Sequence, residues 1–417
     1  MKRHLIGIGG VGMSALATAL VRLGDTVTGS DRNLNTKNIS FLESLGVRCF
    51  PDDGSGVDAE TDEVIVSTAI EDTNPGLVKA KAFGIAVTHR AKALARALEP
   101  FRLVAVVGTC GKSTVTAMLG HVLAECGLDP MCVNGANVPG WLGAVRIPSE
   151  TPVSHSLCSE PRYAVAEVDE SDKSLVAFRP YAAIVTNASA DHYSKEEMDE
   201  VFDTFVKDCP GPVIDARGEV YAPEDFNEQN ASLAVRMAVA LGCDESRARA
   251  AIATFGGVER RLQRILPSSS ANRILTTPVY DDYAHNPEKL RSMWMAIRKR
   301  HGGPLCVVWR PHGYAPLRKM LDDLARMFCE VMSSDDRLLL LPVYDAGGTT
   351  DRSINSDALV ARVGELGGGR NVILVPSLDA AYDWIFANRG GFAAIVTCGA
   401  RDPELPTLAR RIARILV

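Results

Sequence analysis

The sequence predicts an α/β protein of three domains in which strands of parallel sheets alternate with helices. Short apolar strands and amphipathic helices follow one another along the chain, the alternation typical of parallel sheets. Glycine-rich turns follow apolar strands at residues 7–14 and 108–113. At 417 residues the chain has material for about two to three domains. We expect the boundaries to give domains at residues 1–98, 99–264 and 265–417.

The composition is that of a globular protein and narrows the range of partners. Hydrophobic residues make up 46% and charged residues 23%, and no apolar run approaches the roughly 20 residues of a membrane span. The N-terminus enters a glycine turn without a secretory apolar region, so we expect a cytoplasmic protein with no membrane partner. A net charge of −6 without a Lys/Arg run argues against nucleic-acid binding. The ten cysteines lack metal-site spacing, which predicts reduced and mostly buried thiols.

The first domain begins like a nucleotide-binding βαβ unit. A strand over Lys2–Ile8 leads through the glycine turn into a helix over Ala15–Leu23, and a strand over Thr26–Ser30 ends in Asp31. Glycines permit a pyrophosphate to approach the helix closely, and an acid after the second strand is typical of such sites. A merely structural turn is the alternative. A strand over Glu63–Ser67 and further helices complete this domain.

The second glycine turn has the features of a triphosphate-binding loop. Gly108-Thr-Cys-Gly-Lys-Ser113 lies between a strand at Leu103–Val107 and a helix at Thr114–Leu123. Backbone N–H groups that converge at a helix N-terminus attract phosphate oxygens. Lys112 can reach the terminal phosphates, and the hydroxyl of Ser113 can hold Mg²⁺. The sequence therefore predicts that this protein uses ATP.

Acidic side chains follow the next strands of the middle domain. The run Glu167–Asp172 ends an apolar strand that begins at Tyr163, at the strand end where open α/β sheets bind ligands. One of these acids can complete Mg²⁺ coordination with Ser113; a solvated acidic loop is the alternative. The following strand, Ala182–Thr186, leads to an Asp-His pair ending at His192. His192 can serve a second divalent ion, although a structural histidine is the alternative.

The last domain repeats the alternation of strand and helix. Its predicted strands are Leu305–Trp309, Arg337–Leu341, Asn371–Val375 and Ala393–Thr397, before a final helix over Pro406–Leu416. Polar residues Asp281 to Pro287 follow a strand at Val279–Tyr280. The segments Arg260-Arg261 and Arg310–Tyr314 offer guanidinium and imidazole groups suited to phosphates or carboxylates.

Taken in order, these segments resemble the Mur ligases, the ATP-dependent amide-bond-forming enzymes of peptidoglycan synthesis, and most closely the alanine-adding branch. The resemblance covers nearly the whole chain, and ordered motifs of this kind are specific to the family. The segments that carry it are Gly7–Ala15, Val66–Ile70, Asn74-Pro75, His89–Ala91, Gly108–Thr114, Glu167–Asp172, Thr186–His192, Asn227, Asn230, Arg261 and Asp282–Pro287.

The resemblance implies a Rossmann-like domain that binds a UDP-sugar, a central P-loop-type ATPase domain and a Rossmann-like domain that receives the amino acid. It implies that a carboxylate attacks the γ-phosphate of ATP, and that an amine then displaces phosphate from the acyl phosphate. The implied substrates are UDP-N-acetylmuramate or an analogue and a small amino acid, with ATP and Mg²⁺.

The resemblance also implies the site residues. Lys112, Glu167 and His192 would be catalytic, and Ser113, Glu167 and His192 would hold metal. The ATP-binding residues would be Gly108, Thr109, Gly111, Lys112, Ser113, Thr114, Asn227, Asn230, Arg261, Asp282 and Tyr283, the last two reaching the nucleotide across a closing domain interface. The UDP-sugar would contact Gly9, Gly10, Val11, Gly12, Asp31, Ser67, Ala69 and Asn74. The amino acid would meet His285, His312 and Arg318.

Departures from the family pattern leave the substrates open. The middle domain is short between His192 and Asn227, and Cys110 replaces the usual His or Asn of the phosphate loop. Gly313 and Pro316 stand where the alanine-adding pattern has two arginines near the substrates. Their absence favours the alternative of a different acceptor or amino acid, such as a recycled muramyl peptide. A nucleotide-binding homologue without activity is a further alternative.

Overall fold

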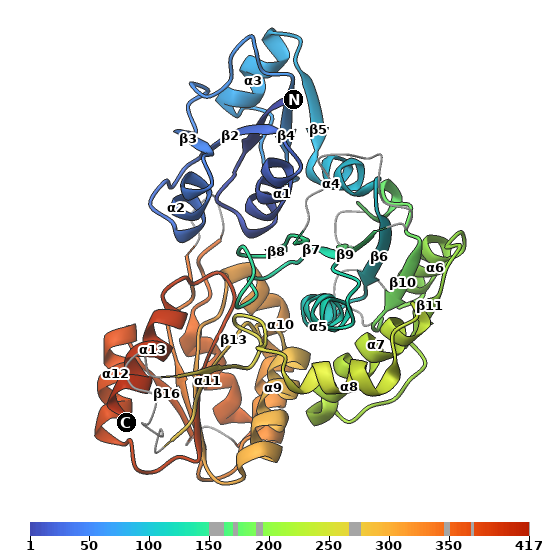
Figure 1. The fold of residues 1–417 in the computed structure, drawn as a ribbon. Helices are drawn as coiled ribbons and strands as arrows, with labels where there is room; N and C mark the ends of the chain where they lie inside the picture. The colour runs from blue at the N-terminus through green and yellow to red at the C-terminus, as the bar shows by residue number, and fades with distance from the viewer. Residues whose placement is uncertain are drawn as a thin grey trace. The chain divides into compact units, whose positions relative to one another are not determined.

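The computed structural model describes residues 1–149, 162–169, 174–188, 195–266, 277–345, 351–367 and 371–416. They form two compact units, one of Met1–Val220 with Glu228–Val258 and one of Tyr221–Asn227 with Glu259–Val417. The first unit holds two sheets and the second holds one (Figure 1). His192 and residues 170–173 lie outside the described residues.

The N-terminal sheet is parallel, in the order β3-β2-β1-β4-β5. Its strands are β1 (Lys2–Ile6), β2 (Thr26–Asp31), β3 (Arg48–Pro51), β4 (Glu63–Val66) and β5 (Ala86–His89). Its helices are α1 (Val11–Arg22), α2 (Lys37–Ser44), α3 (Pro75–Ala82) and α4 (Arg90–Leu98). Helix α1 begins inside the glycine motif, four residues earlier than the sequence predicts, because Gly10 is its extended N-cap.

The middle sheet has the order β11-β10-β6-β9-β7-β8, and β8 is its antiparallel strand. Its strands are β6 (Arg102–Val107), β7 (Met131–Val133), β8 (Val145–Arg146), β9 (Tyr163–Glu167), β10 (Ala182–Val185) and β11 (Val213–Asp215). The helical segments are α5 (Lys112–Glu125), η1 (Ser174–Ala177), α6 (Lys195–Val206), η2 (Pro223–Asp225), α7 (Phe226–Ala240) and α8 (Glu245–Ala253). One apolar core joins this sheet to the N-terminal sheet through residues of α4 and η1.

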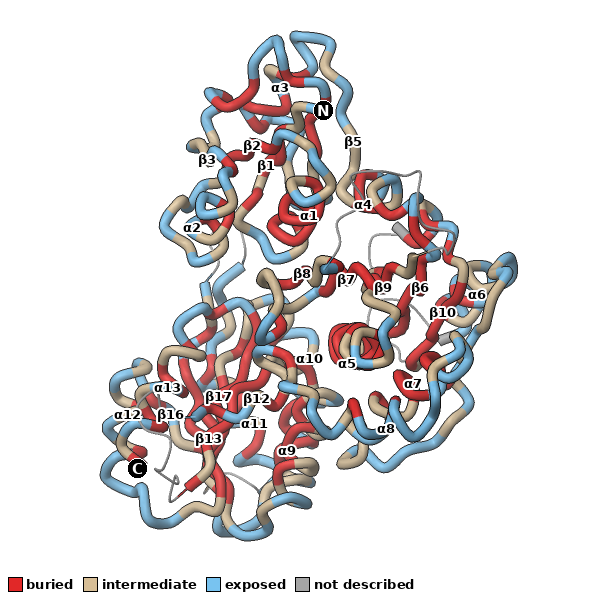
Figure 2. Tube along the Cα trace, in the orientation of Figure 1, coloured by how far each residue is buried: buried red, intermediate tan, exposed pale blue. Residues whose placement is uncertain are grey.

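The C-terminal sheet has the order β12-β13-β17-β14-β15-β16, and β12 is antiparallel to β13. Its strands are β12 (Gln263–Ile265), β13 (Val279–Asp282), β14 (Leu305–Trp309), β15 (Arg337–Leu340), β16 (Val372–Leu374) and β17 (Ala394–Cys398). Its helices are α9 (Pro287–His301), α10 (Tyr314–Val331), α11 (Ser356–Glu365), α12 (Leu378–Ala387) and α13 (Leu405–Ile415). Two apolar clusters sandwich the sheet, and Figure 2 shows its central strands buried.

All nine cysteines in the described ranges are free, as the sequence predicts. Only Cys132, Cys306 and Cys398 are buried, and the other six are half-buried. The expectation of mostly buried thiols was therefore wrong for the described cysteines. Burial raises the pKa of the Cys132 thiol to about 12, which makes it a poor nucleophile at neutral pH.

We expect the buried side chain of His4 to make the N-terminal sheet sensitive to acid. His4 lies between the hydroxyls of Thr28 and Ser30, at 2.9 and 3.3 Å, and burial lowers its pKa from 6.5 to about 4. The unfolded chain therefore binds a proton more readily than the folded one between these values. This contribution to stability is complete above pH 6.5 and is lost as pH falls toward 4.

The expected loss from His4 at pH 5, relative to pH 7.5, is about 2 kcal/mol of unfolding free energy. Urea unfolding of the wild type and of His4→Asn at both pH values measures it, because the other titrating groups are shared. An equal pH dependence in the two proteins would show that His4 is not the source.

Candidate active site

The phosphate loop joins β6 to α5 and has the backbone that phosphate binding requires. Gly108 and Gly111 have φ values of 123° and 86°, a region that side chains disfavour. Helix α5 begins at Lys112, so Ser113 and Thr114 lie in its first turn, both buried. The Nζ atom of Lys112 donates to the carbonyl oxygen of Gly108 at 2.6 Å, which folds the side chain back over the loop.

Thr186 and Asn187, which follow β10, form hydrogen bonds with the backbone of the phosphate loop. The N–H of Cys110 donates to Oδ1 of Asn187 at 2.9 Å, and that of Thr109 donates to the Asn187 carbonyl at 3.3 Å. The hydroxyl of Thr186 donates to the Cys110 carbonyl at 2.6 Å. A Cβ atom at Gly108 would lie 2.2 Å from the Thr186 hydroxyl, so only glycine fits there. Thr186 and Asn187, which the sequence placed in a motif without assigning them a role, thus fix the shape of the loop.

Helix α7 contributes a buried amide to the same loop. A Cβ atom at Gly111 would lie 2.6 Å from Oδ1 of Asn230, which is 4% exposed. Asn227 lies one helical turn earlier on α7. The predicted ATP residue Asn230 is therefore packed against the phosphate loop.

Carboxylates lie at the end of β9 and just after it, at the sheet edge that carries the loop, because β9 lies beside β6. Glu167 accepts the N–H of Gly135 at 2.8 Å, and Asp169 lies 4.0 Å from Nζ of Lys112. In the described ranges no group of three His, Cys, Asp or Glu side chains forms a metal cage. Mg²⁺ does not require one, since it takes one or two carboxylates with substrate phosphates. The oxygen donors of Ser113 and Glu167 fit this chemistry.

The N-terminal glycine turn is held by Asp31. The N–H of Gly9 donates to one carboxylate oxygen of Asp31 at 2.9 Å, and that of Asn33 donates to the other at 3.0 Å. Gly10 and Val11 start α1, whose first turn includes Gly12. A Cβ atom at Gly12 would lie 3.0 Å from Nη1 of Arg90. Arg90 was not predicted as a site residue, although the segment His89–Ala91 contained it.

The other predicted UDP-sugar residues divide into two kinds. The turn that contains Ser67 and Ala69 lies beside the glycine motif, because the side chain of Ile70 is 3.3 Å from a Cβ position at Gly7. Asn74 is buried and caps α3, accepting two backbone N–H groups, while its amide nitrogen donates to Asp52. Asn74 therefore stabilises the start of α3.

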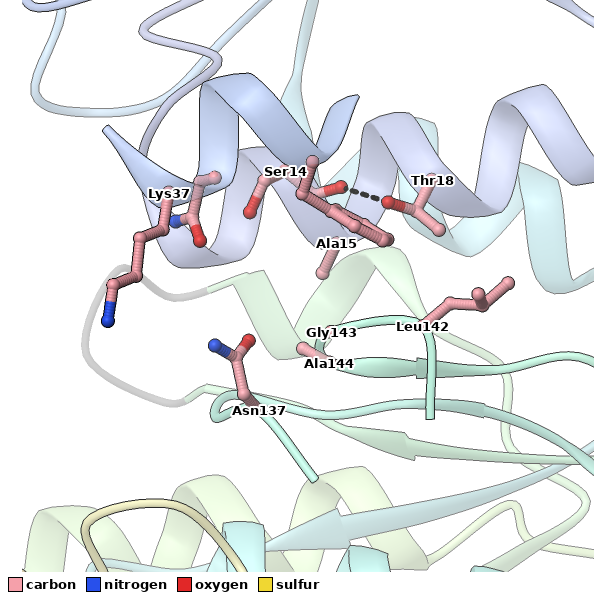
Figure 3. Close-up of a pocket in the computed structure, with 10 residues that line it drawn as sticks. Ser14, Ala15, Thr18, Lys37, Asn137, Leu142, Gly143 and Ala144 are labelled. Carbon is pink, nitrogen blue, oxygen red and sulfur yellow. Dashed lines mark hydrogen bonds between the residues drawn. The ribbon is translucent and has the colours of Figure 1, made fainter. Parts of the chain in front are cut away.

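A cavity of about 180 Å³ lies between α1, α2 and the segment that joins β7 to β8 (Figure 3). Asn38, on its wall, donates to the carbonyl of Gly9 at 2.8 Å. Asn137, on the opposite side, is two residues from Gly135, which binds Glu167. The cavity therefore lies between the glycine turn and the acidic edge. Its residues are Ser14, Ala15, Thr18, Lys37, Asn38, Phe41, Asn137, Leu142, Gly143 and Ala144.

The C-terminal unit places two aspartates inside β13, where the sequence predicted a polar segment after the strand. Asp282 accepts the N–H groups of Leu262 and Ala284 at 2.7 and 2.8 Å, and burial raises its pKa. Burial also raises the pKa of Asp281 to about 6, opposed by the charge of Arg260. These two aspartates can be buried within the strand because backbone N–H groups and Arg260 bind their carboxylate oxygens.

Aromatic and cationic groups cluster after β13 and β14. The guanidinium groups of Arg260 and Arg261 each lie over the ring of Tyr283, 5.2 Å from its centre. The rings of His285 and His312 are 4.8 Å apart, edge to face. The predicted substrate residues His285 and His312 therefore meet.

Arg318, the third predicted amino-acid residue, lies on α10. Its guanidinium pairs with Asp351 at 2.8 Å and donates a hydrogen bond to the hydroxyl of Ser353 at 2.9 Å. Its charge is therefore directed toward that segment.

A phosphate loop with acids at the same sheet edge, in a fold of three α/β sheets, is typical of an enzyme that binds a nucleoside triphosphate. Family models agree along the chain: "Mur ligase family, catalytic domain" matches residues 2–102, "Mur ligase middle domain" residues 106–207, and "Mur ligase, glutamate ligase domain" residues 260–401. The chain belongs to the Mur ligase family, whose members form amide bonds with ATP.

Individual relatives extend over the whole chain. A UDP-N-acetylmuramate–L-alanine ligase of Rubrobacter xylanophilus is 30% identical over 96% of this chain and 97% of its own. One from Hyphomonas neptunium is 29% identical over 96% and 94%. The crystal structure of a UDP-N-acetylmuramate-alanine ligase from Thermotoga maritima has a TM-score of 0.79 at 23% identity, covering 99% and 98% of the two chains. A murein peptide ligase from Psychrobacter arcticus has a TM-score of 0.65 at 20% identity over 100% and 98%.

In the described ranges no helix combines the length and apolar character needed to cross a membrane.

Proposed function

We propose that this protein joins L-alanine to UDP-N-acetylmuramate, using ATP, in the synthesis of peptidoglycan precursors in the cytoplasm. The observation that carries the proposal is the likeness, over nearly their full lengths, to ligases named for these two substrates. The phosphate loop and its acidic neighbours supply the parts that such a reaction needs. We assign the functional domains to residues 1–98, 99–264 and 265–417.

The phosphate loop would bind the triphosphate of ATP. Its N–H groups and Lys112 would neutralise charge as the sugar carboxylate attacks the γ-phosphorus and ADP leaves. Ser113 and Glu167 would hold one Mg²⁺ and His192 a second, and the bound ions would screen the phosphate charge. The amine of the amino acid then attacks the acyl carbon, phosphate leaves, and an amide forms.

The cavity beside the glycine turn would receive the sugar. Its volume of about 180 Å³ suits part of a UDP-sugar, with the pyrophosphate on the turn at Gly9–Gly12. A sugar in contact with Asn137 would be near Gly135 and Glu167, at the sheet edge that carries the phosphate loop. The cavity would thus direct the acceptor carboxylate toward ATP.

Replacing Asn137 with alanine is expected to raise KM for the UDP-sugar about 5- to 10-fold, because one neutral hydrogen bond is lost. The KM for ATP should stay unchanged. Steady-state kinetics with each substrate varied in turn measures this, and Asn388→Ala, at the exposed C-cap of α12, is the matched control. An unchanged KM for the sugar would remove Asn137 from the binding site.

The direct test of function combines phosphate release with product mass. The protein is incubated with ATP, Mg²⁺, UDP-N-acetylmuramate and L-alanine, L-serine or glycine in turn. Phosphate release with a product heavier by one alanine residue supports the proposal. Failure to release phosphate with any amino acid, while ATP still binds, contradicts it.

A second candidate is a Mur-type ligase that adds a different amine or uses a different acceptor, such as a recycled muramyl peptide. Gly313 and Pro316, in place of two arginines, favour it. A mass spectrum of the products from a mixed pool of amino acids, peptides and UDP-sugars separates the two candidates.

A further inference from the structure

Two loops meet at one edge of the C-terminal sheet, at the N-terminus of α10. Strands β14 and β17 are neighbours, with Trp309 opposite Cys398, so the segments that follow them lie side by side. The N–H of Arg310 donates to the carbonyl of Cys398 at 3.2 Å. Gly313, the N-cap of α10, and Arg401, after β17, are on these two segments.

Arg401 has a left-handed backbone conformation, with φ of 66°. Non-glycine residues adopt it only when their surroundings impose it. Here the following residue, Asp402, is 1% exposed and pairs with Arg310 at 2.6 Å, and its N–H donates to the carbonyl of Ala400 at 2.8 Å. These contacts hold the turn and fix the direction in which the Arg401 side chain leaves it.

The Arg401 guanidinium lies beside the two positions that lack the expected arginines. A Cβ atom built on Gly313 would be 4.0 Å from Nη1 of Arg401 and 3.4 Å from the ring of Pro316. The Arg401 guanidinium therefore lies within van der Waals contact of a side chain placed at position 313.

Arg401 differs from the nearby arginines in its partners. Arg310 pairs with Asp402, and Arg318 pairs with Asp351. Within the described part of the chain, Arg401 is exposed and makes no hydrogen bond or ion pair. Its guanidinium is available for an anion.

We propose that Arg401 binds the carboxylate of the incoming amino acid and takes over, from the β17 side, the charge missing at position 313. A guanidinium can bind a carboxylate through two parallel hydrogen bonds and so fix its orientation. His312, next to Gly313, meets His285 edge to face, so the amino acid would lie beside the histidine pair. This inference rests on the proposed function and makes Arg401 a specificity-determining residue.

The test uses Arg401→Gly in the full chain. Glycine tolerates the left-handed conformation, so this variant should unfold at a Tm no lower than that of the wild type. Its KM for L-alanine should rise about 10- to 100-fold, the effect of losing a charge-assisted hydrogen-bond pair, while KM for ATP and the UDP-sugar stays constant. Arg389→Gly, another exposed arginine of this unit, is the control.

Two further readouts separate binding from structure. The wild type should strongly prefer L-alanine to its amide, and Arg401→Gly should lose that preference. Gly313→Arg in the Arg401→Gly background should restore both KM and the preference, since the space is then free and φ at position 313 is extended, at 163°.

The outcomes distinguish the two proposals. If the wild type forms product but Arg401→Gly keeps its KM and its discrimination against the amide, the role of Arg401 is refuted and the ligase activity stands. If the wild type forms no product with any amino acid, the proposed function is refuted, and the role of Arg401 is refuted with it.

Discussion

Lys112→Met is expected to lower the kcat of product formation about 1,000-fold, because the charge that stabilises the transferring phosphoryl group is removed. The Lys112 side chain is 12% exposed and folded over the loop, so methionine keeps its aliphatic packing. Initial rates of ADP formation at saturating substrates measure the effect.

Binding must be separated from chemistry in this variant. Calorimetry with a non-hydrolysable ATP analogue should show a loss of affinity much smaller than the loss of kcat. Lys81→Met, at an exposed pair with Asp72, is the control and should retain full activity. If Lys112→Met kept more than about a tenth of the wild-type kcat, the assigned role of Lys112 would be wrong.

The sequence predicted strands best where a continuous apolar run forms a central, fully buried strand of a sheet. The apolar run Leu305–Trp309 is a strand with the predicted bounds, because it is buried on both faces in the sheet centre. Strands β3 and β5 were missed, because edge strands have one neighbour and their side chains are largely exposed. The bounds of β13 were also wrong, because partners distant in sequence satisfy Asp281 and Asp282.

The candidate site was most directly predictable where one segment carries the whole geometry. The phosphate loop is such a segment, because its glycines, lysine and helix start are consecutive. Neither the approach of Arg401 to Gly313 nor that of Asn137 to the acidic edge has a local signal. Both depend on strand order, which short-range patterns do not encode.

Glu167→Gln is expected to lower kcat roughly 100- to 1,000-fold at millimolar Mg²⁺, because an amide is a much poorer ligand for this cation than a carboxylate. Glutamine keeps the length of the side chain, and its oxygen can still accept the N–H of Gly135. The fold should therefore be preserved, and the defect should lie in the metal site.

The dependence on Mg²⁺ distinguishes a ligand from a structural residue. For Glu167→Gln the activity should rise with Mg²⁺ over concentrations at which the wild type is already saturated. Glu196→Gln, at the exposed start of α6, should behave like the wild type. A structural role for Glu167 instead predicts a lower Tm with an unchanged Mg²⁺ midpoint. That pattern would mean that Glu167 does not bind the metal together with Ser113. Another acid at this sheet edge would then have to bind it, and Asp169, 4.0 Å from Nζ of Lys112, would be the first to test.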